Sequence, residues 1–250
     1  MTARVLLAGE SWISQATHYK GFDSFTSVTF HTGADEYIAA LARQGIEVEQ
    51  MYAHDVPDRF PGDLDALAAY DVVILSDIGA NSFLLPQSTW IHGQSGTNRL
   101  RLLADWVRDG GGLMMAGGYM SFQGFQARAN FARSPLAEVL PVEMSDYDDR
   151  VEAPEGALAA LVAPEHPVGA TWRGTAPAIL GYNRVRAKAD ATLVATVGGD
   201  VLIATGEYGN GRSLVWTTDI GPHWCPAELS RWEGFEPLMA AMIRWLRREA

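Results

Sequence analysis

One stretch, LLADWVRDGGGLMMAGGYMSFQG at 102–124, constrains the fold more than any other part of the chain. Its first apolar residues, within 102–107, follow helical spacing and predict a helix. The triplet at 110–112 ends that helix, because glycine accepts a positive φ without strain. Leu113–Ala116 is a short, fully apolar run, which is typical of a strand inside a parallel sheet. The stretch therefore predicts a helix that leads into a buried strand of an α/β protein.

A glycine turn follows this strand, and it has the layout of a nucleophile elbow. Gly117 and Gly118 let the chain turn sharply, which places Tyr119 and Ser121 at the carboxyl edge of the sheet, where α/β proteins bind ligands. Ser121 is a candidate nucleophile, or alternatively the cap of a following helix. No GxGxxG or GK[ST] pattern follows the glycines, so a nucleotide cofactor is not expected.

The rest of the first half alternates strands and helices. Apolar runs at 4–8, 46–51 and 72–75 are separated by amphipathic segments, a pattern that predicts βαβ crossovers and a mainly parallel sheet. Residues 142–218 instead alternate short β-rich runs with tight turns, and we expect them to extend the same sheet with antiparallel strands. No linker separates the two halves, so residues 1–250 are expected to form one domain.

The segment Ile13–Phe30 lacks clean periodicity. It leaves the first strand at the binding edge, so it is interpreted either as a functional lid that carries His18 and Lys20, or as a surface Ω-loop held by its own aromatic residues.

Composition excludes several classes of protein. The net charge is −11, which disfavours nucleic acid as a partner. No apolar run reaches membrane-spanning length, and the start of the chain lacks a secretory pattern, so we expect a cytoplasmic protein without a membrane partner. The single cysteine rules out an internal disulfide and a cysteine-based zinc site. Assembly into a homo-oligomer is left open.

The second informative stretch is DIGPHWCPAE, at 219–228, which follows the predicted strand 213–218. Prolines on both sides of His223 restrict the loop. A histidine held at a strand end, with Asp219 or Glu228 to orient it, is typical of a general base. The alternative is a histidine that only hydrogen-bonds its own loop.

Four segments, at 10–12, 77–81, 118–121 and 219–224, each follow an apolar strand. Carboxyl ends of neighbouring parallel strands share one edge, so these segments are expected to converge into one cleft that binds a small molecule. Crowded carboxylates there should raise at least one carboxyl pKa and favour protonated His223. The expected ligand-binding residues are Glu10, Ser11, Trp12, His18, Lys20, Asp77, Asn81, Gly118 and Trp224.

A divalent metal is a weaker alternative for this cleft. Oxygen and imidazole ligands would come from Glu10, His18, Asp77, Asp219 and His223. No HxH or HxxxH spacing supports such a site, so neither a metal nor another cofactor is assigned.

Several motifs together resemble the class I glutamine amidotransferase-like family. They are GESW, KGFDSF, YDVVILSDIGAN, GGGLMMAGGYMSFQG, SPLAEVLPV, LGYNRV, GEYGNGR and TTDIGPHW, and they run from Gly9 to the closing helix. The resemblance implies a flavodoxin-like α/β core, related to class I amidotransferases and to the sugar-linked ThuA-like proteins.

The resemblance also implies where a glutaminase would carry its cysteine, at the elbow. This elbow has Gly118, Tyr119 and Ser121 instead, and the only cysteine is Cys225, beside His223. Cys225 is either a reactive thiolate or an inert thiol. In both cases it lies far along the chain from the elbow. We therefore predict no glutaminase activity.

Two hypotheses about function follow. The chain is an enzyme that acts on a small polar metabolite, a carbohydrate or an amide, with His223 as base, Asp219 or Glu228 orienting it, and Glu10 and Tyr119 as polar partners. Alternatively, it is a non-catalytic binding or scaffolding protein, because a fold alone does not decide function.

Overall fold

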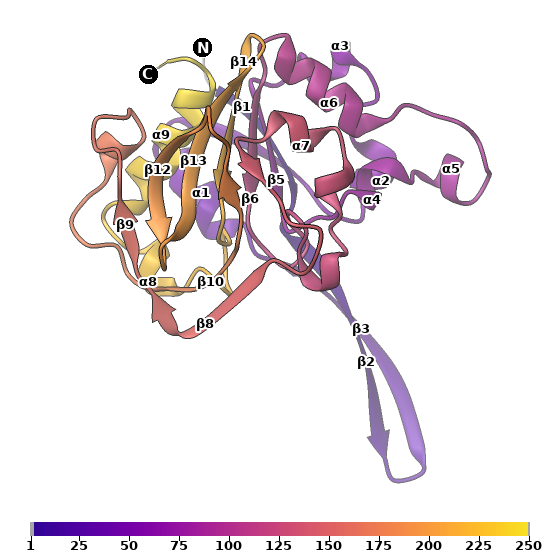
Figure 1. Ribbon diagram of the computed structural model, residues 1–250. Coiled ribbons are helices and arrows are strands. Elements are labelled where there is room, and N and C mark those ends of the chain that lie inside the picture. Colours follow the sequence, from indigo (N-terminus) through magenta and orange to yellow (C-terminus); the bar gives the residue numbers. More distant parts are fainter. Residues whose placement is uncertain (1–2, 250) are drawn as a thin grey trace.

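The computed structural model describes residues 3–249, and its centre is one eight-stranded sheet (Figure 1). Five strands are mutually parallel and come first in the sheet order, as β4, β1, β5, β6 and β14. Three antiparallel strands, β13, β12 and β9, complete it. The predicted fold class is confirmed, including the antiparallel extension. In sheet order the strands are β4 Ile46–Met51, β1 Ala3–Gly9, β5 Val72–Ser76, β6 Gly112–Ala116, β14 Gly211–Trp216, β13 Asp200–Tyr208, β12 Thr192–Val197 and β9 Ala159–Leu161.

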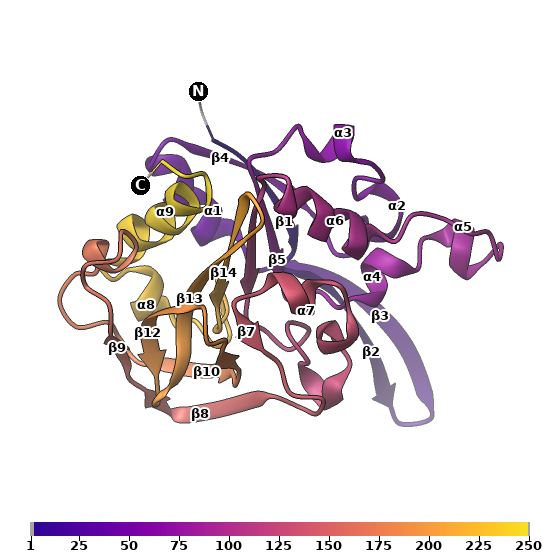
Figure 2. The same ribbon diagram turned by 45° about the horizontal axis from the view of Figure 1, so that its top comes forward.

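Helices cover both faces of the sheet (Figure 2). One face is covered by α1 Asp35–Arg43 and α9 Phe235–Leu246, and the opposite face by α2 Val56–Arg59, α3 Leu64–Leu67, α4 Asn81–Leu84, α6 Arg99–Arg108 and α7 Leu136–Val139. The remaining short helices are α5 Gln87–Trp90, α8 Ala227–Ser230, η1 Phe125–Ala127, η2 Phe131–Arg133 and η3 Gly169–Thr171.

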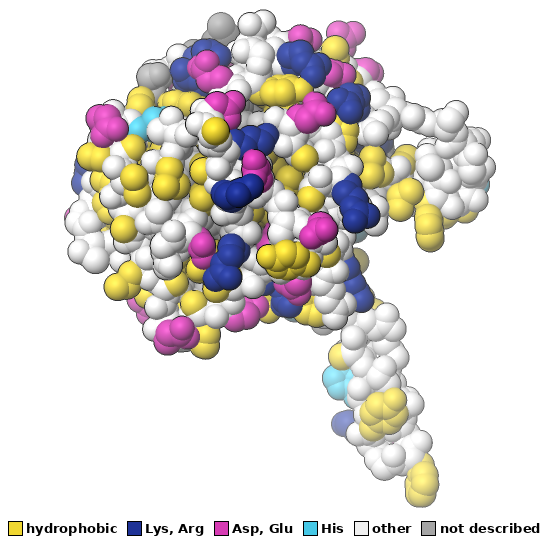
Figure 3. Space-filling view, in the orientation of Figure 1, with side chains coloured by type: hydrophobic (Ala, Val, Ile, Leu, Met, Phe, Trp, Pro, Cys, Tyr) yellow, Lys and Arg dark blue, Asp and Glu magenta, His cyan; other side chains and the backbone are white. Residues whose placement is uncertain are grey.

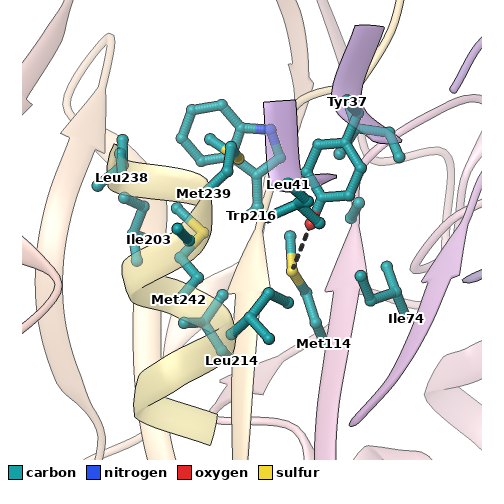
Figure 4. Packing of buried hydrophobic residues seen from close by; sticks show 14 of the residues in the cluster. Tyr37, Leu41, Ile74, Met114, Ile203, Leu214, Trp216, Leu238, Met239 and Met242 are labelled. Atoms are coloured by element: carbon teal, nitrogen blue, oxygen red, sulfur yellow. Dashed lines mark hydrogen bonds between the residues drawn. The ribbon is translucent and has the colours of Figure 1, made fainter. Parts of the chain in front are cut away.

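Two hydrophobic cores result from the alternation of side chains along each central strand. In β6, Met114 faces the core under α1 and α9, whereas Leu113 and Met115 face the other core. Successive side chains of a strand point to opposite faces, so a strand that is buried on both sides is apolar at every position. Figure 4 shows the first core, in which the Tyr37 hydroxyl of α1 donates to Met114 Sδ. These cores fix the strands whose carboxyl ends carry the polar residues described below.

Two small sheets lie beside the main one. β8 Arg150–Ala157 pairs with β10 Ile179–Asn183, and β7 Val142–Glu143 pairs with β11 Arg186–Ala187, both antiparallel. The first of these brings residues from the middle of the chain to the carboxyl edge of the large sheet.

The segment expected to be a loop at 13–30 is a long β-hairpin. β2 Ser11–Lys20 and β3 Asp23–Thr32 pair over ten residues each and project away from the body (Figure 1). The loop conformation that both interpretations assumed is therefore wrong. The hairpin escaped detection because it is exposed on both faces, and without a buried face it has no alternation of apolar and polar residues.

Candidate functional site

Three neighbouring strands end in residues with positive φ. Glu10 follows β1 with φ 48°, Asp77 follows β5 with φ 44°, and Gly118 lies two residues after β6 with φ 142°. This conformation is uncommon for residues other than glycine and gathers at functional sites. The carboxyl edge of the sheet therefore holds two acidic side chains on strained backbone, next to a glycine at the elbow.

Glu10 is the most deeply buried of these acids, with 2% of its surface exposed. Ser76 Oγ donates to Glu10 Oε2 at 2.6 Å, and the backbone amide of Glu10 donates to the Ser76 carbonyl at 2.8 Å. Burial raises the pKa of Glu10 to about 8, and the negative charges of Asp219 and Asp77 add to the shift. Glu10 is therefore mostly protonated at neutral pH.

Asp77 lies between Glu10 and the elbow. Its Oδ1 accepts from the Met120 amide at 2.7 Å, and its own amide donates to Ser121 Oγ at 3.1 Å. Burial raises the pKa of Asp77 to about 6, with a further contribution from Asp219. Ser121 is itself buried and caps no helix, so its hydroxyl orders the turn at Asp77.

Asp219 and His223 form the pair that links the cluster to solvent. His223 Nδ1 lies 3.1 Å from Asp219 Oδ2, which also accepts from the Trp224 amide at 3.0 Å. The hydrogen bond with Asp219 raises the pKa of His223, and partial burial opposes the shift. The Asp219 side chain is 4% exposed and that of His223 is 53% exposed. A fixed carboxylate thus holds one ring nitrogen and leaves the other edge of the ring free for a proton transfer.

Aromatic rings surround the exposed imidazole. The Tyr119 ring meets the His223 ring edge to face at 4.7 Å, and the Trp224 ring lies 5.3 Å from it. Glu152 joins both neighbours, because Tyr119 Oη donates to one of its oxygens at 2.8 Å and Trp224 Nε1 to the other at 3.0 Å. The Arg150 guanidinium lies over the Tyr119 ring at 4.7 Å. The result is a polar-aromatic surface around His223.

Arg150 and Glu152 were not predicted from the sequence, because they lie on β8, far along the chain from the elbow. A signal exists in their spacing, since residues i and i+2 of a strand share one face. Asn183 was also missed, although it stands in the motif LGYNRV.

The Asn183 side chain fixes the backbone of the elbow at Gly118. It accepts from the Gly118 amide at 3.0 Å, and its side-chain amide donates to the Gly118 carbonyl at 3.2 Å and to Asp149 Oδ1 at 2.9 Å. Asp149 in turn accepts from the amides of Gln123 and Gly124. A Cβ at Gly118 would lie 2.8 Å from Asp77 Oδ1 and 3.0 Å from Asp219 Oδ1. The elbow has no room for a side chain.

The structure thus gathers Glu10, Asp77, Gly118, Tyr119, Asp219, His223 and Trp224 at one edge, and it separates other candidates from them. Ser11 is buried, and its hydroxyl accepts from the Ala53 amide at 2.8 Å. Trp12, His18 and Lys20 belong to the projecting hairpin, where Trp12 stacks on His31 and His18 on Phe25. Asn81 and Glu228 are exposed in the first turns of α4 and α8, and it is Asp219 that contacts His223.

The candidate metal ligands are not assembled as a set. His18 lies on the hairpin, and among residues 3–249 no group of three or more His, Cys, Asp or Glu side chains is arranged to hold a metal ion. No helix within the described part of the chain is long and apolar enough to cross a membrane.

A cavity of about 620 Å³ lies away from the His223 cluster, against β7, β11 and the start of β13. Its charged lining residues pair with each other on the surface, as Arg186 with Glu143 and Arg184 with Asp200. A cavity of this size is the usual first candidate for a binding site. We favour the open surface at His223 because shifted carboxyl pKa values and an oriented imidazole meet there.

Comparisons with known proteins agree with this fold. Residues 4–248 match the model of a family described as putative glutamine amidotransferase. Two solved structures from Salmonella typhimurium, Cytoplasmic Protein STM3548 and, from strain LT2, Cytoplasmic Protein STM1381, are 42% and 41% identical, with TM-scores of 0.93 and 0.92. Each alignment covers 97% of this chain, together with 98% and 99% of the respective relative.

A more distant structure has the same fold. A putative thua-like protein from Bacteroides uniformis is 12% identical with a TM-score of 0.57, over 98% of this chain and 91% of that one. No curated protein matches the chain.

Proposed function

The chain belongs to the putative glutamine amidotransferase family, and we propose that it uses the carboxyl edge of this fold for acid–base chemistry on a small neutral metabolite, a carbohydrate or an amide, and not for glutamine hydrolysis. The observation that carries the proposal is the His223–Asp219 pair, in which a buried carboxylate 3.1 Å from Nδ1 orients a half-exposed imidazole. Such a pair is the usual form of a general base.

His223 performs the proton transfer in this proposal. Its Nε2 takes a proton from a water molecule or from a substrate hydroxyl, and Asp219 stabilises the imidazolium that forms. The imidazolium then returns the proton to the leaving group. The reaction class that fits proton removal from water, followed by protonation of a leaving group, is hydrolysis.

The surroundings of His223 select the substrate. Tyr119, which is partly exposed, offers its ring to the apolar side of a sugar, while Arg150 and Glu152 offer hydrogen-bonding groups at the rim. The Trp224 ring is fully buried and supports this surface from within. Asp77 and Asp219 give the edge a negative potential, which repels anionic metabolites. A neutral ligand rich in hydroxyl or amide groups fits this surface.

The test uses a panel of neutral sugars, sugar lactones and small amides, added at millimolar concentration to the purified protein. A compound that binds the native state raises Tm. We expect at least one such compound for the wild type, a loss of that shift in His223→Ala, and its retention in the matched control His92→Ala, which changes an exposed histidine on another face. A panel without any stabilising compound, or a shift that persists in His223→Ala, would contradict the proposal.

A non-catalytic role is the second candidate, and the openness of the site favours it. The His223 side chain is 53% exposed, which is more than a water-excluding active site allows. The stabilising compound separates the two roles, because an enzyme converts it to product, whereas a binding protein returns it unchanged after prolonged incubation.

We also predict that the protein releases no ammonia from glutamine. The elbow position is a glycine without room for a side chain, and burial raises the pKa of the Cys225 thiol to about 12, with added repulsion from Asp219 and Glu10. A protonated thiol is a poor nucleophile. A coupled ammonia assay checks the prediction, and release that Cys225→Ala abolishes would refute it.

We also propose that the protein is cytoplasmic. The two Salmonella proteins are named as cytoplasmic proteins and share more than 40% identity with this chain. This supports a cytoplasmic location for the chain.

A further inference from the structure

The elbow directs two backbone amides at a carboxylate of the protein itself. The Met120 amide donates to Asp77 Oδ1 at 2.7 Å, and the Tyr119 amide also acts as a donor to this side chain. Burial raises the pKa of Asp77, and the hydrogen bonds from these amides oppose the shift. Successive amides that converge on one point form a nest, which is a common anion-binding site in proteins. In this protein the nest at 119–120 is therefore filled by Asp77.

The backbone of Asp77 holds the carboxylate in the nest. Asp77 has φ 44°, a conformation that aspartate tolerates better than most residues do. Its own amide donates to Ser121 Oγ at 3.1 Å, so the main chain and the side chain of Asp77 both bind the turn. A Cβ on Gly118 would lie 2.8 Å from Asp77 Oδ1 and 2.9 Å from Asp77 Cβ, so the carboxylate packs directly against the elbow. This contact leaves no room for a second anion.

Donors at this position are what the hydrolysis of an amide would need. The tetrahedral intermediate of acyl transfer carries an oxyanion, and at a nucleophile elbow the backbone amide of the next residue binds it. Here the amides that follow Gly118 donate to Asp77, whose charge would repel an oxyanion. The elbow is therefore unsuited to the hydrolysis of an amide bond.

The acids at the elbow also differ from those on the rest of the surface. Figure 3 shows acidic and basic side chains mixed over the body, where arginines pair with several of the acids. Among residues 3–249, by contrast, no lysine or arginine forms an ion pair with Glu10, Asp77 or Asp219, and His223 is the partner of Asp219. The negative charge at the elbow is therefore not neutralised by a permanent cation.

Fixed negative charge favours a reaction in which positive charge develops. Cleavage of a glycosidic bond passes through a transition state that resembles an oxocarbenium ion, with positive charge on the sugar ring. A carboxylate beside the ring stabilises this charge, whereas it destabilises the oxyanion of amide hydrolysis. The hydrogen bond with Asp219 is the main cause of the raised pKa of His223, and the charge of Asp77 adds to it. The charge of Asp77 thus reaches the imidazole that acts on the substrate.

We propose that Asp77 is a built-in occupant of the anion site at the elbow and that it thereby makes the cleft specific for glycosidic bonds, and not for amide bonds. The second part rests on the proposed function, because it needs His223 as the base. In the reaction, water gives a proton to His223 Nε2 and its oxygen bonds to the anomeric carbon. The glycosidic bond breaks, and its electron pair leaves on the aglycone oxygen, which receives the proton from the imidazolium.

The first test removes the side chain from the nest. Asp77→Gly deletes a group that corresponds to acetate and frees the amides of Tyr119 and Met120. We expect sodium acetate, at roughly ten times its dissociation constant, to raise the Tm of this variant by about 3–6 °C. Acetamide, the neutral analogue, should have no such effect. The wild type and Asp77→Asn, in which a side chain still fills the nest, are the matched controls and should not respond to acetate.

Nuclear magnetic resonance locates the bound acetate. In Asp77→Gly, the amide resonances of Tyr119 and Met120 should move as acetate is added. A variant that folds only in acetate gives the same answer as a rise in Tm. A variant that acetate neither stabilises nor folds, or an equal response in Asp77→Asn, would overturn the assignment of Asp77 as the occupant.

The second test compares the two kinds of bond in the wild type. The probes are 4-nitrophenyl glycosides of neutral hexoses and N-acyl 4-nitroanilides, whose products absorb visible light. We expect cleavage of at least one glycoside and of no anilide, and a kcat lower by about tenfold or more in Asp77→Asn, which keeps the shape of the side chain and loses its charge. Anilide cleavage that depends on His223 would overturn the specificity and leave the proposed function standing. Failure of both probe classes to bind or react would overturn the two together, while the acetate test still decides the role of Asp77.

Discussion

Gly118→Ala lowers the free energy of unfolding by about 2 to 6 kcal/mol. At φ 142° a side chain costs about 1–3 kcal/mol in backbone strain. The new Cβ also meets Asp77 Oδ1 at 2.8 Å and Asp219 Oδ1 at 3.0 Å, and overpacking of this kind costs another 1–3 kcal/mol or so. For a domain of this size, Tm falls by roughly 2–4 °C per kcal/mol. Thermal and urea unfolding measure the effect.

Gly110→Ala is the matched control for this variant. Gly110 has φ 132°, and a Cβ there meets nothing within 4 Å, so it bears the strain without the clash. The entropy that alanine removes from the unfolded chain is the same in both variants. We expect Gly110→Ala to lose about 1–3 kcal/mol. Equal losses in the two variants would show that the carboxylates do not close on the elbow.

Glu10→Gln makes the protein more stable than the wild type at pH 8, and not at pH 5. The pKa of Glu10 is about 8 in the folded protein and 4.5 in its ordinary environment. Between these values the folded state keeps a proton that the unfolded state has released, so the wild type loses stability as pH rises through this window. Glutamine has no proton to release and still accepts from Ser76 Oγ.

The expected difference between the two proteins is on the order of 4 kcal/mol at pH 8, because the pKa of Glu10 rises from 4.5 to about 8 on folding and one pKa unit corresponds to about 1.4 kcal/mol. Contributions from Asp77 and His223 occur in both proteins and cancel. Urea unfolding at several pH values gives the two curves, with Glu228→Gln, an exposed position, as control. Parallel curves for wild type and Glu10→Gln from pH 5 to 8 would contradict a buried, protonated Glu10.

The parts of the fold that could be predicted are the buried helices and strands, because burial requires apolar residues at regular spacing. Leu113–Ala116 and the apolar runs at 46–51 and 72–75 lie in strands as predicted. The hairpin of β2 and β3 could not be predicted, because two strands that are exposed on both faces show no alternation of apolar and polar residues.

The site followed from one rule, that neighbouring parallel strands end at the same edge, and this rule brought Glu10, Asp77 and Asp219 together. It says nothing about strands that reach this edge from outside the parallel sheet. Glu152 and Asn183 come from such strands, β8 and β10, and they fix Tyr119 and Gly118. Their positions depend on the pairing of β8 with β10, which lie far apart in the sequence, and a local sequence pattern does not predict such pairing.

The central claim is that His223, oriented by Asp219, meets the ligand. Nuclear magnetic resonance of the His223 ring, titrated with pH in the wild type and in Asp219→Asn, tests it most directly. We predict a pKa above the ordinary 6.5 in the wild type and a lower one in Asp219→Asn, because the hydrogen bond with Asp219 is the main cause of the shift. We also predict that a compound that raises Tm moves the His223 resonances and leaves those of His92 in place. Identical titrations in both proteins, with His223 resonances that the compound leaves unmoved, would contradict the claim.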